Sequence, residues 1–166
     1  LEHGDLRRDE LCYVGDGNNM CHSLLNLAGC LGMRMVVCTP KGYGPDAGIL
    51  ASASRLATHN GGQIRLEAEP LSAVKGASFV YTDVWASMGQ EAEAEERRKV
   101  FRPFQVNAEL LAAAPAHAKI LHCLPAHRGE EITADVFESE RAIVFDQAEN
   151  RLHAQKAILE RLISGA

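Results

Sequence analysis

The sequence predicts an α/β fold in three α/β/α layers, built around a Rossmann-like, mostly parallel sheet. Short apolar runs of strand length alternate with helical patterns along the chain, and internal repeats and low-complexity linkers are absent. Such alternation favours parallel strands joined by crossovers, with helices on both faces of the sheet. A chain of 166 residues is long enough for one domain of this kind, so we expect residues 1–166 to form a single unit.

The N-terminal half supplies the clearest local signals. An apolar run ending in Gly-Asp predicts a strand over 11–16, and leucines at helical spacing predict a helix over 18–32 that Gly32 ends. A second strand over 33–40 closes with proline, and Asn-Gly-Gly ends the next helix. In chain order, these and the following elements are expected at 11–16, 18–32, 33–40, 47–62, 63–68 and 70–76.

The C-terminal half continues the alternation. We expect strands over 77–85 and 118–125, and a strand-like run over 141–147. The charged segment 89–101 and the segment 107–115 are expected to be helical. An amphipathic pattern predicts a C-terminal helix over 148–163.

Composition excludes several classes of protein. Apolar residues make up 46% and charged residues 23%, values typical of a soluble globular chain. The net charge of −5 disfavours a nucleic-acid partner, and the basic cluster 97–99 follows acidic residues, so we expect a solvated helix face. An apolar stretch long enough to cross a membrane is absent, as is the apolar region of a signal peptide.

The five cysteines match neither a metal pattern nor a redox pattern. Their number is odd, and four of them stand among apolar neighbours in the first forty residues. We therefore expect small buried hydrophobic side chains rather than disulfides, and a reducing cytoplasmic location.

Polar clusters follow three of the predicted strands, at the edge where open parallel sheets bind ligands. The first, GDGNN at 15–19, fails the G-x-G-x-x-G dinucleotide pattern because Met20 stands where glycine is required. One of its two asparagines suits the cap of the following helix. The other amide, beside free backbone N–H groups, could bind a carboxylate.

The second cluster is TDVWASMGQE at 82–91. Asp83 ends an apolar strand, and the large apolar residues Trp85 and Met88 stand in what should be a polar loop. That composition, together with a flexible glycine, favours a lid that folds over a ligand.

The third cluster, HCLPAHRGEE at 122–131, has three interpretations. A metal site is disfavoured, since adjacent His122 and Cys123 point in different directions and His127 is five residues from His122. A nucleophilic Cys123 lacks a base identified by local sequence. The third interpretation, one wall of a pocket, requires the other two clusters beside it, as the predicted fold implies.

These motifs, in the order GDGNN, TPKGYGPD, DVWASMGQE, HCLPAHRGEE and FDQAENRLHAQKA, resemble the second domain of the ornithine carbamoyltransferase family over nearly the whole chain. The resemblance implies an enzyme that transfers the carbamoyl group of carbamoyl phosphate to the δ-amine of L-ornithine. It implies neither a cofactor nor a metal. It also identifies residues 1–8 as the end of an interdomain helix and linker.

The resemblance assigns roles to individual residues. Asn19 and the Met88 backbone would bind the carboxylate of ornithine, and Asp83 and Ser87 its α-amino group. Cys123 would lie near the reacting δ-amine. The carbamoyl group of carbamoyl phosphate would meet Cys123, the Leu124 carbonyl, the His122 side chain and Arg151. An imidazole and a guanidinium aimed at the carbamoyl oxygen would stabilise its developing negative charge.

One departure from the family is informative. The other domain of the family contains a Ser-x-Arg-Thr-Arg phosphate loop and a His-Pro-x-Gln run, and neither occurs in this sequence. We therefore expect the ornithine-binding half alone, inactive in isolation, from an enzyme that forms homotrimers largely through its other half. The alternatives are a stand-alone amino-acid-binding module and a related transcarbamylase with another amino-acid acceptor.

Overall fold

The computed structural model describes residues 6–86 and 93–165. It contains a five-stranded parallel sheet with the order β3-β2-β1-β4-β5. The strands are β1 (Glu10–Val14), β2 (Arg34–Cys38), β3 (Gln63–Glu67), β4 (Phe79–Thr82) and β5 (Lys119–His122). The sheet confirms the predicted fold class, and the strand order reverses direction beside β1, where β4 pairs with it.

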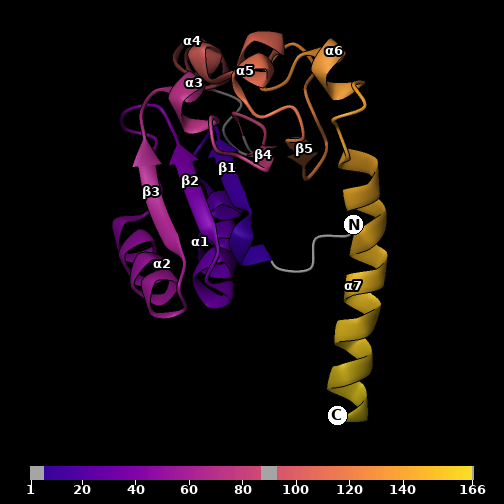
Figure 1. The fold of residues 1–166 in the computed structure, drawn as a ribbon. Helices are drawn as coiled ribbons and strands as arrows, with labels where there is room; N and C mark the ends of the chain where they lie inside the picture. The colour runs from indigo at the N-terminus through magenta and orange to yellow at the C-terminus, as the bar shows by residue number, and fades with distance from the viewer. Residues whose placement is uncertain (1–5, 87–92, 166) are drawn as a thin grey trace.

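Helices cover both faces of the sheet, as Figure 1 shows. The longer helices are α1 (Asn19–Leu31), α2 (Ala47–His59), α4 (Ala94–Phe101) and α7 (Val144–Ser164). The described residues also form short helices: η1 (Leu6–Arg8), α3 (Pro70–Ala73), η3 (Arg102–Phe104), α5 (Ala108–Ala113) and α6 (Ala134–Phe137). Within the predicted segment 1–8, the described residues 6–8 form η1.

Alternation along β1 produces two cores. Leu11 and Tyr13 pack with α1 and α2 on one face, whereas Cys12 and Val14 pack with α3, α5 and α6 on the other. Successive strand side chains point to opposite faces, so a strand buried on both sides must be apolar throughout. This explains why the central strands lack a polar face in the sequence.

The prediction of a strand over 141–147 is wrong. Ala142 makes one isolated parallel bridge with Ile120, and α7 begins at Val144, earlier than the predicted start at 148. β-branched and aromatic residues favoured strand at 141–145, but Val144 is buried as the first residue of a helix instead. The short helix α6 was not predicted at all.

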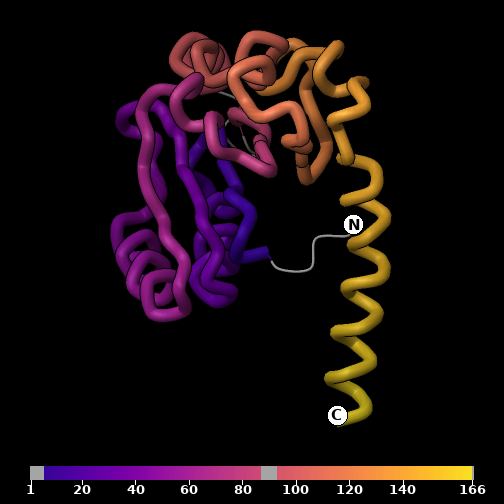
Figure 2. The backbone as a smooth tube through the Cα atoms, in the orientation of Figure 1, coloured from indigo at the N-terminus to yellow at the C-terminus, as the bar shows by residue number. Residues whose placement is uncertain are grey.

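Helix α7 lies along one side of the molecule, and its C-terminal part extends away from the sheet (Figures 1 and 2). Val144 is its one buried residue within the described chain. Several of its large apolar side chains are exposed: Phe145, Leu152, Ile158, Leu159, Leu162 and Ile163. The residues described include no helix that is both long enough and apolar enough to span a membrane.

Candidate active site

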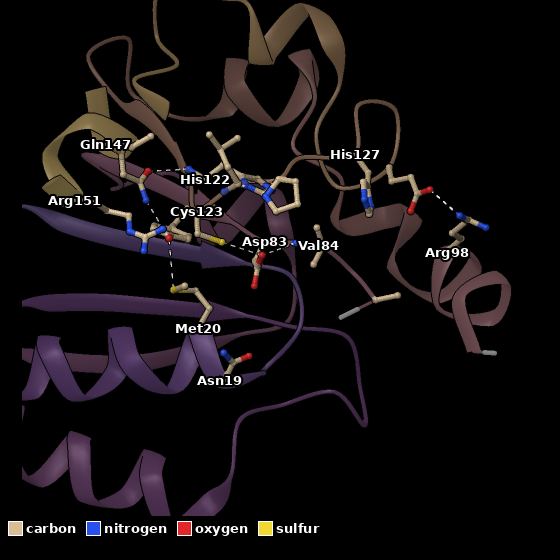
Figure 3. Close-up of a pocket in the computed structure, with 16 residues that line it drawn as sticks. Asn19, Met20, Asp83, Val84, Arg98, His122, Cys123, His127, Gln147 and Arg151 are labelled. Atoms are coloured by element: carbon tan, nitrogen blue, oxygen red, sulfur yellow. Dashed lines mark hydrogen bonds and ion pairs between the residues drawn. The ribbon is translucent and has the colours of Figure 1, made fainter. Parts of the chain in front are cut away.

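A cleft of about 1010 Å³ lies at the carboxyl ends of the central strands, with the start of α7 forming one wall. Figure 3 shows side chains from α1, β4, β5 and α7 converging there. Six predicted site residues line it: Asn19, Asp83, His122, Cys123, Leu124 and Arg151. Ser87 and Met88, with the rest of the expected lid after Ala86, lie outside the described residues.

The two asparagines of GDGNN have different positions. The Asn18 side chain caps α1 by accepting from the N–H groups of Met20 and Cys21, at 3.0 and 3.3 Å. Asn19 is exposed and lines the cleft. The sequence left open which amide was the cap, and this geometry assigns that role to Asn18.

Gly17, in the same turn, lies directly against another backbone segment. Its N–H donates to the Tyr43 carbonyl at 2.8 Å, and a Cβ at Gly17 would lie 2.3 Å from the Gly44 carbonyl carbon. The glycine therefore permits close packing of two backbone segments at this edge of the sheet.

Asp83 follows β4 and is nearly buried, and three donors surround its carboxylate. Oδ2 accepts from Asn18 Nδ2 at 3.0 Å, while Oδ1 accepts from the Val84 N–H at 2.8 Å and from Cys123 Sγ at 3.0 Å. These contacts link the strand ends of the three predicted clusters. They also hold the carboxylate still without consuming all its lone pairs.

Cys123 is a protonated thiol in this setting. Burial raises its pKa to about 12, and the hydrogen bond to Asp83 and the charge of that carboxylate act in the same direction. A reactive cysteine needs a lowered pKa, which an electropositive environment supplies. This site provides the reverse and so does not favour a nucleophilic Cys123.

His122 is fully enclosed, and both of its ring nitrogens have protein partners. Nδ1 accepts from the Leu124 N–H at 2.8 Å, and Nε2 lies 3.2 Å from Glu131 Oε1. An Nδ1 that accepts places the hydrogen of the neutral ring on Nε2, where it donates to the carboxylate. His122 thus connects the Leu124 backbone, which has a left-handed φ of 59°, to Glu131.

Sequence reasoning missed Gln147 and Tyr81. Gln147 Oε1 accepts from the His122 N–H at 3.0 Å, and its Nε2 donates to the Tyr81 hydroxyl at 3.1 Å. This amide fastens the start of α7 to the ends of β4 and β5. Gln147 lies in the motif FDQAENR, but the expected strand over 141–147 assigned it to a strand rather than to the first turns of α7.

Charged side chains of both signs line the cleft. Arg151 extends from α7 on the side of Met20 and Cys123, while Arg98 pairs with Glu130 on the far side (Figure 3). Arg98 Nη2 lies 2.9 Å from Glu130 Oε1. Charges of both signs in one cleft suit a zwitterionic or a phosphorylated ligand.

One group of possible metal ligands occurs in residues 6–86 and 93–165. Atoms of His127, Glu130 and Glu131 lie within 4.8 Å of one another. However, Glu130 is paired with Arg98, and Glu131 accepts from His122 and from the His127 N–H. Oε1 of Glu130 and Oε1 of Glu131 therefore already have protein partners, whereas Glu131 Oε2 is buried without a hydrogen-bond partner among the described residues.

Two sequence-based interpretations near the cleft are wrong. Arg97 does not belong to a solvated face: it is 4% exposed and paired with Asp16. Trp85, which was expected to belong to a lid, is already buried without a ligand. It is 2% exposed and packs on Phe101 with ring centroids 6.1 Å apart.

Comparison with known proteins decides the family. The family model described as "Aspartate/ornithine carbamoyltransferase, Asp/Orn binding domain" matches residues 8–162. The chain belongs to this carbamoyltransferase family. It is 55% identical to ornithine carbamoyltransferase of Pyrococcus horikoshii over 162 residues, which are 98% of this chain and 51% of that protein.

Solved carbamoyltransferase structures have the same fold. The ornithine carbamoyltransferase of Pyrococcus furiosus matches with a TM-score of 0.90 at 55% identity, covering 95% of this chain and 50% of that one. The anabolic enzyme of Campylobacter jejuni matches with a TM-score of 0.91 at 35% identity, over 99% and 55%. The chain thus spans about half the length of the carbamoyltransferases it matches.

Proposed function

We propose that this chain is the L-ornithine-binding half of an ornithine carbamoyltransferase. The complete enzyme transfers the carbamoyl group of carbamoyl phosphate to the ornithine δ-amine, giving citrulline and phosphate. The observation that supports this proposal best is the meeting of Asn19, Asp83, Cys123 and Arg151 in one cleft. Relatives more than half identical in sequence do not favour a non-catalytic binding module.

Recognition of the amino acid follows from the polar groups near α1 and β4. The exposed Asn19 amide, at the start of a thirteen-residue helix, suits the ligand's α-carboxylate. Asp83 suits the α-ammonium group through a charge-assisted hydrogen bond. Ser87 and the Met88 backbone are proposed to complete these two contacts. A diamine lacks the carboxylate and would leave Asn19 without its partner.

The reacting amine is proposed to lie beside Cys123. The thiol hydrogen is directed to Asp83, so the sulfur lone pairs remain available to accept from the neutral δ-amine. Cys123 would orient the nitrogen lone pair toward the carbamoyl carbon, where proximity and orientation accelerate the attack.

Carbamoyl phosphate is proposed to bind between this cleft and the other half of the enzyme. The Leu124 carbonyl would accept from the carbamoyl amide, and the Arg151 guanidinium would stabilise negative charge on the carbamoyl oxygen. The catalytic role expected for His122 is proposed to be indirect, since its enclosed ring holds the Leu124 backbone. Attack of the amine forms the C–N bond, phosphate leaves, and the nitrogen loses a proton.

The complete enzyme is proposed to be a cytoplasmic homotrimer that binds no nucleic acid. The free thiols of all five cysteines and the net charge of −5 are compatible with that proposal. Light scattering of the complete enzyme would test the trimer.

A ligand titration tests the proposed function. L-Ornithine, followed by nuclear magnetic resonance, should shift the amide signals of Asn19 and residues around Asp83, and L-aspartate and 1,4-diaminobutane should bind more weakly. Asp83→Asn should weaken ornithine binding about tenfold or more, because a hydrogen bond to a charged group contributes about 1.5–3 kcal/mol. Asp46→Asn, at the cap of α2 outside the cleft, serves as the matched control. Preference for L-aspartate would contradict the proposal.

A further inference from the structure

Arg97 lies in the charged stretch of α4 yet is 4% exposed. Its guanidinium pairs with Asp16 through Nη2, and its Nε donates to the Trp85 carbonyl. The guanidinium carbon also lies 4.9 Å from the centre of the Tyr43 ring and 5.2 Å from that of Phe101. A planar cation enclosed by two rings and bonded to two acceptors has very little freedom to move.

These contacts join two segments that are distant in sequence. Asp16 follows β1 and precedes the turn that starts α1, whereas Trp85 follows β4. The segment after β1 contains Asn19, and the segment after β4 contains Asp83. Arg97 does not line the cleft, but it bonds to both segments that deliver the amino-acid anchors.

A second contact depends on the relative position of the two segments. Asn18 caps α1 with its oxygen and donates from its amide nitrogen to Asp83 at 3.0 Å. A relative shift of the segments would break this bond and change the spacing between Asn19 and Asp83. Arg97 opposes such a shift because its planar fork presents donors in fixed directions.

Removal of the guanidinium would leave Asp16 without its counter-ion. Burial raises the pKa of Asp16, and the charge and hydrogen bond of Arg97 oppose that rise. Loss of one partner from a buried ion pair leaves an uncompensated group that relaxes by moving toward water. Movement of Asp16 would displace the turn that leads to Asn19.

We infer that Arg97 is a positioning residue of the amino-acid site, whose guanidinium sets the distance between Asn19 and Asp83 that an α-amino acid must span. The inference rests on the proposed ornithine site. It goes beyond that proposal by assigning part of the affinity to a side chain outside the cleft.

Two substitutions and a matched control test the inference. Arg97→Lys keeps the charge and loses the fork, and Arg97→Gln also loses the charge. Arg141 is the control, because its guanidinium donates to the carbonyls of Ala118, Leu111 and Pro115 away from the cleft. Arg141→Lys therefore removes a similar structural fork without touching the anchors.

Affinity for L-ornithine should fall about tenfold in Arg97→Lys and further in Arg97→Gln, since small displacements of positioned groups are costly. Arg141→Lys should lower the melting temperature yet change the affinity by less than about twofold, as expected of a site with no shared partners. In the complete enzyme the Arg97 variants should raise KM for ornithine more than they lower kcat.

Trp85, the only tryptophan of the sequence, provides a readout that needs no ligand. Its emission should shift to longer wavelength in the Arg97 variants and stay unchanged in Arg141→Lys, and amide exchange should quicken at residues 15–19. If Arg97→Gln fails to fold, Asp16→Asn breaks the same pair from the other side and should reproduce the loss of affinity.

A lower melting temperature with unchanged ornithine affinity, emission and exchange would overturn the inference and leave Arg97 a purely structural residue. If the unmodified chain failed to bind L-ornithine, the proposed function alone would be contradicted. The emission and exchange measurements would then still decide whether Arg97 holds the two segments together.

Discussion

The Cys123 thiol donates to Asp83 Oδ1 at 3.0 Å and so joins the end of β5 to the end of β4. Burial, and then the neighbouring carboxylate, raise the pKa of this thiol to about 12. At neutral pH the sulfur therefore remains protonated. It donates to Asp83, and its lone pairs can accept a hydrogen bond in the cleft.

Replacement of Cys123 by serine in the complete enzyme should slow carbamoyl transfer roughly ten- to a hundredfold and weaken ornithine binding, with measurable activity remaining. Serine keeps a hydrogen-bonding group but is smaller than cysteine. A covalent nucleophile would instead be required in every turnover, and its loss would lower kcat by several orders of magnitude. Steady-state kinetics and mass spectrometry distinguish the two, and a trapped carbamoyl-cysteine would contradict our interpretation.

Alkylation should report the effect of Asp83 on the thiol. Asp83 raises the pKa of Cys123, so Asp83→Asn should lower it and increase the thiolate fraction at any pH below about 12. Iodoacetamide should then modify Cys123 faster, as measured by peptide mass spectrometry at pH 8. Exposed Cys30 in the same sample is the internal control. Equal rates at Cys123 in both proteins would argue against the hydrogen bond.

Glu131 should stabilise the 122–131 segment. Its Oε1 accepts from His122 Nε2 at 3.2 Å and from the His127 N–H at 2.6 Å. Glu131→Ala should lower the free energy of unfolding by about 2–4 kcal/mol, because it strands donors in a buried site. Glu131→Gln keeps an acceptor and should cost about half as much or less. Urea unfolding measures both, and equal losses would contradict this expectation by showing that the amide oxygen of glutamine does not replace the carboxylate as an acceptor.

Exposed side chains of α7 should add little to the stability of this chain. Leu162 and Ile163 are 74% and 84% exposed, whereas Val144 is fully buried. Replacing Leu162 and Ile163 together by serine should change the free energy of unfolding by less than about 0.5 kcal/mol. Val144→Ala should cost about 1–2.5 kcal/mol. A large loss from the double substitution would mean that the apolar face of α7 is buried by another copy of the chain.

The isolated chain should form no citrulline from carbamoyl phosphate and L-ornithine. It lacks the Ser-x-Arg-Thr-Arg segment whose arginines are expected to bind phosphate. Addition of the other half of the enzyme should restore transfer. A colorimetric citrulline assay tests this, and turnover by the chain alone would overturn the assignment of phosphate binding to the other half.

The position of the cleft could be predicted from the sequence, because it depends on local patterns. Apolar runs alternating with helices specified parallel strands, and polar residues after those runs had to meet at one edge of the sheet. Asn19, Asp83, Cys123 and Arg151 were identified in this way or by family resemblance, and they line one cleft. Local chemistry located the three strand ends at the cleft, whereas Arg151 was included only through the family resemblance, and the sequence did not tell which asparagine was the cap.

Tertiary structure alone decided the burial of Arg97, the hydrogen-bond partners of His122 and the residue at which α7 begins. Arg97 and Arg98 are adjacent in sequence, yet one is buried against Asp16 and the other exposed beside Glu130. His122 finds its acceptor nine residues away, and Gln147 belongs to a helix that the sequence presented as a strand. Each of these outcomes depends on the burial and hydrogen-bonding partners that other segments supply. The residues adjacent in sequence do not identify those partners, because long-range contacts override local propensity.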